Sequence, residues 1–476
     1  MDKQHQEITE LAEKMGLDFY PIIYHVVDFE TMTNVCSYGL PVRARHWSYG
    51  RSYDHHKLYG EMGFSKIYEV IFNNNPSHAF MLDTNTKEAS MLVTAHCCGH
   101  SDFFKNNYLF QGTNRNMVHH AADHASRVDD YIDKYGLEKV ERIMDIAFAL
   151  NDHIDPFKGL YRKPYGKKKT LKTSNFLNDD DRLRGIGKSI NTTKKQVLNN
   201  TFPPHPEKDL LWFFINHAPL ETWEADVLDM IREESYYFYP QRMTKIMNEG
   251  WASFWHAEIL YQYKNITPEE HMNFARLHEK VVQAGGNPFS INPYYLGFRI
   301  FVDIEKRWDK MYKEGKSKIT GREKIFQVRS EEDDVSFLRN YLTADLVEEL
   351  GLFIYGRGTD LDHRPLYKDV VIRSRMKEDV VEQLIKPICT GGVPEMAITQ
   401  ASSEKLCIKH LNPDIGTIDF RYAEQTLGFI FELWATPIEL SVLDDDGEPV
   451  TLRYDLLGFN VLKDEDDLDF LEENDE

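Results

Sequence analysis

Hydrophobic residues recur along this chain at two different spacings, and the change between them divides the sequence. Up to roughly residue 340 the usual interval is three or four residues, which is typical of amphipathic helices. Residues 137–151 illustrate it, because five apolar side chains fall on one helical face: Val140, Ile143, Met144, Ala147 and Leu150. Beyond about residue 350, apolar and polar residues alternate in short runs, which favours β-strands.

The first part of the chain is predicted to be mainly helical. The segment TPEEHMNFARLHEKVVQ begins with a threonine cap, a proline and two acids, as a helix start should. Further helices are expected over residues 5–15, 117–133, 137–151 and 241–263. A small β element is expected near residues 20–95, where GLDFYPIIYHVV and SKIYEVIF have extended patterns. A helix that contains the segment TAHCCGH follows it.

The last part of the chain reads as short strands around one amphipathic helix, RYAEQTLGFIFELWA, and a hairpin whose turn contains DDG. The predicted fold class is therefore α+β. We expect a mainly helical domain over 1–345 and a small α+β module over 346–463. Residues 155–205 are polar and basic and predict a long surface excursion. Residues 464–476 are mostly Asp and Glu and predict a disordered tail.

Charge and composition exclude several classes of partner. The formal net charge is -21, which argues against nucleic acid and anionic membranes as partners. The sequence contains no apolar run long enough for a membrane span and no apolar core of a secretory signal. The cysteines are few and scattered, so we expect a reduced, cytoplasmic protein.

Candidate metal ligands occur in two segments. In TAHCCGHSDFFKNN, His96 and His100 stand one helical turn apart, where two imidazoles can share one metal ion. In MNEGWASFW, Glu249 lies in an aromatic-rich helix, where a buried carboxylate needs a cation, a hydrogen-bond network or a metal. His256 follows on the same face and is a candidate fourth ligand. Two histidines and one glutamate form a zinc set with an open position. A packed polar network without metal is the alternative.

Six longer blocks identify a family resemblance. They are GLDFYPIIYHVV, YGLPVRARHWSYG, GFSKIYEVIFNNNPSHAFMLDTN, AHCCGHSDFFKNN, FYPQRMTKIMNEGWASFWH and INPYYLGFRIFVDI. These blocks resemble the SpoVR (stage V sporulation protein R) family. The resemblance implies a cytosolic bacterial protein with a role in spore cortex formation, or in stress and stationary-phase physiology. It also implies a PrkA-type serine protein kinase and a von Willebrand A-like protein as partners.

A more distant, local resemblance concerns the chemistry. NEGWASF resembles a segment of gluzincin metallopeptidases whose glutamate is the third zinc ligand, and HCCGH resembles their H-E-x-x-H. The resemblance implies a zincin-like core with His96, His100 and Glu249 as ligands. Cys97 stands where those enzymes carry their general base. Asp102 is the candidate replacement, as a base or as an orienting partner of a histidine. Cys97 could instead bind the metal, or pair with Cys98 in a strained disulfide.

Two functions compete at this point, and a metal enzyme of another chemistry is a third. One is a hydrolase that uses zinc or a similar divalent metal to cleave an amide bond in a peptide or peptidoglycan-like substrate. The other is a non-catalytic component of a kinase-associated assembly, in which a structural metal or a buried polar cluster holds helices together. The cysteine in place of the usual glutamate base favours the second.

Overall fold

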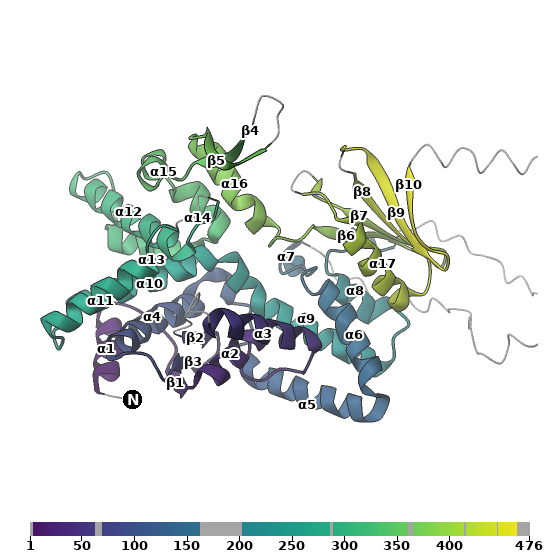
Figure 1. The fold of residues 1–476 in the computed structure, drawn as a ribbon, viewed down its shortest axis with the longest axis horizontal. Coiled ribbons are helices and arrows are strands. Elements are labelled where there is room, and N and C mark those ends of the chain that lie inside the picture. Colours follow the sequence, from purple (N-terminus) through teal and green to yellow (C-terminus); the bar gives the residue numbers. More distant parts are fainter. Residues whose placement is uncertain are drawn as a thin grey trace, which may run out of the picture. The chain divides into compact units, whose positions relative to one another are not determined.

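The computed structural model describes residues 3–61, 69–161, 202–285, 289–359, 365–413, 416–444 and 446–463. These residues fall into two compact units, and each unit combines helices with sheet (Figure 1). The first unit takes Met1–Asp130 and Tyr236–Gly392, and the second takes Tyr131–Ser235 and Val393–Glu476. The protein is α+β with a mainly helical N-terminal region, as the hydrophobic spacing predicts.

The predicted boundary at residue 345 differs from the division in the structure, which changes unit after Gly392. α16 (Lys377–Cys389) belongs to the first unit, because Val380 and Ile385 are buried in its main apolar core. The spacing of apolar residues indicates the type of an element but not the core that the element joins. The spacing therefore cannot locate this boundary.

Helices make up most of the first unit, and their apolar faces share one core. Trp251, Trp255 and Phe301 are completely buried in it. Two further helices, α5 (Met117–Tyr135) and α9 (Thr222–Met243), belong in part to each unit. Besides α16, the remaining helices of the first unit are α1 (Lys3–Lys14), α2 (Phe29–Tyr38), α3 (Trp47–Glu61), α4 (Lys87–Asn106), the 3-10 helix η1 (Tyr108–Phe110), α10 (Lys245–Gln262), α11 (Pro268–Val281), α12 (Pro293–Lys313), α13 (Gly321–Glu331), α14 (Asp334–Tyr341) and α15 (Ala344–Leu350).

A three-stranded sheet precedes α4 in the first unit. β3 (Ser77–Leu82) is central, parallel to β1 (Ile22–Val27) and antiparallel to β2 (Glu69–Phe72). α4 starts soon after β3, where the Thr86 side chain accepts a hydrogen bond from the backbone N–H of Ala89. A small β element followed by the helix that contains TAHCCGH is the order that the sequence predicts.

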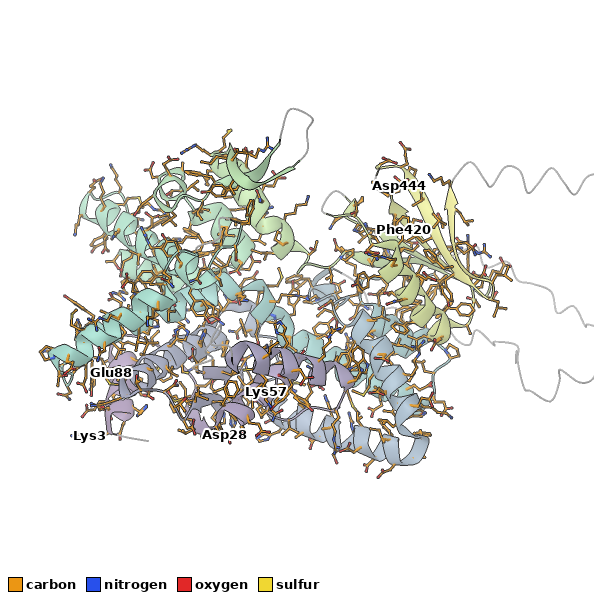
Figure 2. All side chains as sticks on the ribbon, in the orientation of Figure 1. Lys3, Asp28, Lys57, Glu88, Phe420 and Asp444 are labelled. Atoms are coloured by element: carbon orange, nitrogen blue, oxygen red, sulfur yellow. The ribbon has the colours of Figure 1, made fainter. Side chains whose placement is uncertain are left out.

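Two more strands of the first unit, β4 (Ile354–Thr359) and β5 (Pro365–Ser374), form a separate antiparallel pair. Figure 2 shows the side chains on this framework and labels Glu88, an acid in the first turn of α4. A negative side chain at this end of a helix interacts favourably with the helix dipole.

The second unit is a five-stranded sheet with helices. Its strands lie in the order β10 (Gly458–Lys463), β9 (Pro449–Asp455), β8 (Ile438–Leu443), β7 (Leu406–His410) and β6 (Met396–Ala401), and β7 and β8 are its parallel pair. α17 (Phe420–Trp434) connects these two strands and buries Leu427, Ile430 and Leu433. Further helices of this unit are α6 (Leu137–Leu150), α7 (Lys158–Tyr161) and α8 (Leu210–His217).

Two predicted segments fall wholly or largely outside the described residues. The acidic tail 464–476 is one, and most of the polar excursion 155–205 is the other. Among the helices that the structure describes, none combines the length and the apolar character needed to cross a membrane.

Candidate metal centre

Glycines allow the three central helices of the first unit to approach closely. A Cβ atom added to Gly99 of α4 would lie 2.7 Å from the Cα of Ala252 on α10. A Cβ on Gly250 of α10 would likewise collide with the backbone of Gly297 on α12. Real Cβ contacts are essentially never this short, so a side chain at either glycine would force the helices apart. The glycines of HCCGH and NEGWA therefore allow close helix packing. This packing brings the polar residues of both motifs together.

His96, His100 and Glu249 converge at this crossing. His96 Nε2 lies 3.5 Å from Glu249 Oε2, and His100 Nε2 lies 3.4 Å from the same oxygen. One ligand atom from each residue can be chosen so that all three lie within 4.8 Å of one another. The structure thus brings together the three residues that the sequence singles out, at a spacing compatible with one shared cation.

Two atoms of this cluster have no hydrogen-bond partner in the described structure. They are His96 Nε2 and Glu249 Oε2, and both are buried. Burial raises the pKa of the Glu249 carboxyl, but the neighbouring His100 and His96 outweigh burial, so the net shift is downward. An ionised carboxylate and an imidazole nitrogen without a hydrogen bond, both away from water, form a donor set that a divalent cation would satisfy.

His256 lies behind His96. Its Nδ1 is 3.0 Å from His96 Nδ1, and its Nε2 is 2.7 Å from His278 Nδ1. Burial, followed by the nearby histidines, holds the pKa of His256 well below its ordinary value. If Nε2 of His96 carries the lone pair, its Nδ1–H donates to His256, and His256 donates on to His278. His256 is therefore placed to orient His96, and it is not part of the converging ligand set.

Asp102 has a different setting from the one predicted. Its carboxylate accepts hydrogen bonds from the backbone N–H of Asp18 and from Trp251 Nε1, each at 2.8 Å, and lies 3.5 Å from Arg329. Six residues along a helix correspond to a rotation of about 240°, so Asp102 and His96 lie on different faces. Burial, opposed by Arg329, raises the pKa of Asp102 to about 6. Asp102 connects α4 with α10 and α13, and it is not among the converging residues His96, His100 and Glu249.

The two cysteines of the motif are structural. Cys97 and Cys98 are both free and completely buried. Cys97 packs against Ala79, Met81 and Val93. Burial raises the pKa of both thiols. A neutral thiol in an apolar setting is a poor metal ligand, so Cys97 acts as a core side chain.

Sequence reasoning missed two residues at the cluster. Glu69 of β2 places its Oε1 atom 3.8 Å from His96 Nε2. The ring of Tyr294, on α12, stacks against His96 with centroids 6.0 Å apart. The charge of Glu249, followed by burial, raises the pKa of Tyr294. A signal for Glu69 was present, because it is the single charged residue in the apolar run IYEVIF.

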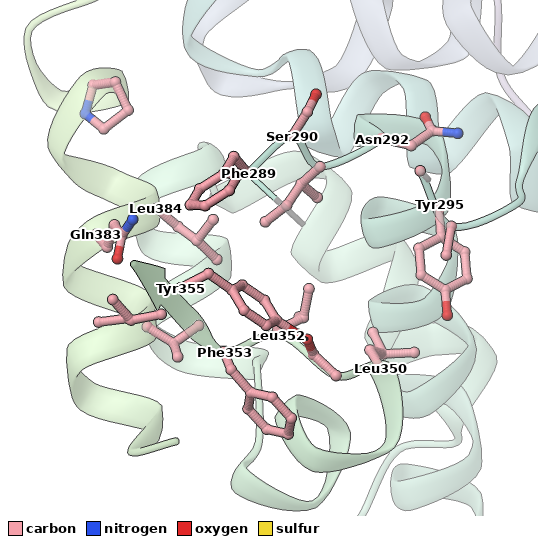
Figure 3. Close-up of a pocket in the computed structure, with 17 residues that line it drawn as sticks. Phe289, Ser290, Asn292, Tyr295, Leu350, Leu352, Phe353, Tyr355, Gln383 and Leu384 are labelled. Atoms are coloured by element: carbon pink, nitrogen blue, oxygen red, sulfur yellow. Dashed lines mark hydrogen bonds between the residues drawn. The ribbon is translucent and has the colours of Figure 1, made fainter. Parts of the chain in front are cut away.

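Two cavities lie in the first unit, and one of them adjoins the cluster. One, of about 520 Å³, is lined by Glu69, His96 and Tyr294 among others. The other, of about 600 Å³, is lined mainly by apolar and aromatic side chains, including Phe353 and Leu384 (Figure 3). Asn292 lines both cavities. The cluster therefore adjoins space that a small ligand can occupy.

A model of the SpoVR like protein family matches residues 1–389, which include the whole cluster. The chain belongs to the SpoVR-like protein family. This SpoVR-like chain is also 28% identical over 481 residues to the "Uncharacterized protein YcgB" of Escherichia coli (strain K12), covering 94% of the chain and 92% of that relative. No solved structure matches it. The family prediction is confirmed, whereas the likeness to gluzincin peptidases stays a prediction.

Proposed function

We propose that this SpoVR-like protein is a metal-dependent hydrolase of amide bonds in a peptide or peptidoglycan-like substrate. The observation that carries the proposal is a pair of buried ligand atoms next to a cavity, His96 Nε2 and Glu249 Oε2, which lie close together without a hydrogen bond. His100 completes the donor set. Two imidazoles and one carboxylate suit zinc or a similar divalent ion.

The environment of the three ligands supports this fit. His100 Nδ1 lies 2.9 Å from Asn248 Oδ1, so the ring donates there and keeps its Nε2 lone pair. His256 can likewise accept a hydrogen bond from Nδ1 of His96, which leaves the Nε2 lone pair of His96 available. Such partners on the far nitrogen are typical of metal-ligating histidines. Both lone pairs are thereby directed at the oxygen of Glu249.

Glu69 is the residue best placed to replace the missing glutamate base. A divalent ion in the cluster supplies Lewis-acid polarisation of a carbonyl and lowers the pKa of water. Glu69 faces His96 and lines the cavity, so its carboxylate can take a proton from the attacking water. The water oxygen bonds to the carbonyl carbon as Glu69 takes this proton, and the proton then passes to the leaving nitrogen as the C–N bond breaks. General-base assistance of this kind contributes roughly 10²- to 10⁴-fold in rate.

The non-catalytic alternative predicts a different environment. A metal or polar cluster that only joins helices needs no adjoining space, and it is best closed by protein ligands on all sides. The cavity of about 520 Å³ beside His96 favours the hydrolase. The cysteine at position 97 counts less against it once Glu69 is available from another element.

The physiological setting is also a proposal. The family resemblance supports a cytoplasmic role in spore cortex formation or in stress and stationary-phase physiology. It further supports association with a PrkA-type serine protein kinase and a von Willebrand A-like protein. Neither partner is needed for the chemistry proposed at His96, His100 and Glu249.

Metal content decides the first step of the proposal. Elemental analysis of purified protein should find one divalent ion per chain in wild type and in a control variant, His119→Ala, whose side chain is exposed. His96→Ala and Glu249→Ala should lose it. Glu69→Gln should keep the metal and lose hydrolysis of a generic peptide mixture by roughly 10²- to 10⁴-fold. A wild-type protein that binds no divalent metal would refute the proposal.

A further inference from the structure

The cavity beside His96 is lined by two chemically distinct groups of residues, which we call its polar and its aliphatic wall. One is polar and contains Glu69, His96, Asn292 and Tyr294. The other is aliphatic and is formed by Ala89, Leu92 and Val93 of α4 and by Leu277 and Val281 of α11. The polar wall contains the atoms proposed to react. The aliphatic wall has no role in the proposed chemistry, so its apolar side chains indicate which kind of ligand group the cavity binds.

The cavity, about 520 Å³, has room for one amino-acid residue and the peptide bond that precedes it, with space left over. Ala89 and His96 mark its extent along α4, and seven residues of helix rise about 10 Å. The aliphatic lining favours a branched aliphatic side chain, because apolar surface buried there gains about 25 cal/mol per Å². A charged side chain would leave its head group without a partner on this wall.

Lys280 is the single cationic residue among the described residues that line the cavity. It is exposed, and the described structure gives it no hydrogen bond or ion pair. It follows Leu277 by three positions on α11, so the two side chains lie on neighbouring parts of one helical face. An ammonium group at the border of an aliphatic wall can pair with a ligand carboxylate next to an aliphatic side chain.

We propose that this cavity binds the carboxyl-terminal residue of a peptide, with an aliphatic side chain against α4 and α11 and the terminal carboxylate on Lys280. The amide that precedes this residue then points toward His96 and Glu69. The inference deepens the proposed function and rests on it for the reacting bond, but not for binding. Cleavage there would release one amino acid, with the hydroxyl of water on the new acid and its proton on the new amine.

Calorimetric titration of the full-length protein with short peptides tests the recognition directly. The probes are N-acetyl-Ala-Leu with a free carboxylate, its carboxyl-terminal amide, and N-acetyl-Ala-Glu. We expect wild type to bind the first at least about tenfold more tightly than the other two, a margin typical of one charge-assisted contact. Lys280→Gln should bind the free acid and the amide equally. Lys264→Gln, an exposed lysine outside the cavity, should behave as wild type.

Zinc content measured on the same samples separates the two proposals. If zinc binds but the acid and the amide bind equally or not at all, the terminal-residue inference is wrong and the metal centre stands. If the carboxylate preference depends on Lys280 but no metal binds, the inference stands and the hydrolase proposal is wrong. Equal binding of the leucyl and glutamyl peptides would overturn the role assigned to the aliphatic wall.

Discussion

Asn248 and His100 are joined by a contact of 2.9 Å between the amide oxygen and Nδ1 of the ring. The other ring nitrogen, Nε2, lies 3.4 Å from Glu249 Oε2. Two consecutive residues of α10 therefore contact the two nitrogens of one histidine on α4. Burial lowers the pKa of His100, but Glu249 outweighs burial, so the net shift is upward. In a neutral ring, a proton on Nδ1 that is donated to Asn248 would leave the lone pair of Nε2 beside the carboxylate.

Removing the amide should weaken metal binding without removing a ligand. Asn248→Ala leaves the His100 ring free to rotate and to change tautomer, so we expect zinc affinity to fall by about 10- to 100-fold. A competition titration with a chromophoric chelator measures this. Asn273→Ala, which removes an amide that contacts Glu88 instead, is the matched control and should leave the affinity unchanged. Equal affinities for Asn248→Ala and wild type would show that the ring is held by other contacts.

The close approach of α4 and α10 leads to a prediction about stability. Gly99→Ala places a methyl group against the backbone of Ala252, and overpacking of this kind costs about 1–3 kcal/mol. Gly50 lies in α3, and a Cβ added there would have no atom within 4 Å, so Gly50→Ala should instead stabilise by up to about 1 kcal/mol. Urea unfolding of the two variants should give opposite signs. A neutral result for Gly99→Ala would mean that the helices can separate at little cost.

The helices and the convergence of His96, His100 and Glu249 were predictable because each depends on a short stretch of sequence. Helical spacing alone places His96 and His100 on one face, and the segment around Glu249 is distinctive. Glu69 was not predicted, because its position depends on how β2 pairs in a sheet and how that sheet meets α4. A pattern along one strand does not specify which helix its side chains face.

The surroundings of Asp102 were not predictable for a related reason. Proximity in sequence to His96 suggested a shared site, but the helix turns the carboxylate toward Trp251 and Arg329. Neither partner is close to Asp102 along the chain, so no local pattern shows them. The spacing of apolar residues does not reveal the change of unit after Gly392 for the same reason. The core that α16 joins is made by residues far from it in the sequence.

Asp102→Asn tests the structural role given to that residue. The change removes a buried charge that accepts hydrogen bonds from Asp18 and Trp251 and neighbours Arg329, so we expect a loss of about 1–3 kcal/mol in the free energy of unfolding. Metal bound per folded chain should stay the same, as measured by elemental analysis. Loss of metal from a protein that remains folded would instead place Asp102 in the site.

Asp334 gives the stability of the first unit a dependence on pH. Its carboxylate accepts hydrogen bonds from the backbone N–H groups of Ile246 and Met247, each at 2.8 Å, in the first turn of α10. Burial raises the pKa of Asp334 to about 7, although these bonds and Lys245 oppose the rise and Asp333 adds to it. The folded state therefore holds this proton more tightly than the unfolded state does.

The sign of the effect follows from the raised pKa. The stabilisation is complete below the unfolded pKa and is lost as the pH rises through the folded value, between about 4 and 7. Asp334→Asn cannot titrate, so the stability of wild type relative to this variant should fall across that window, by at most about 1.4 kcal/mol per pH unit. Urea unfolding of both proteins at about pH 5, 6, 7 and 8 measures the difference in free energy of unfolding across this range. A difference that stays constant or grows with pH would show that the carboxylate is ionised in the folded protein throughout, held by the N-terminus of α10.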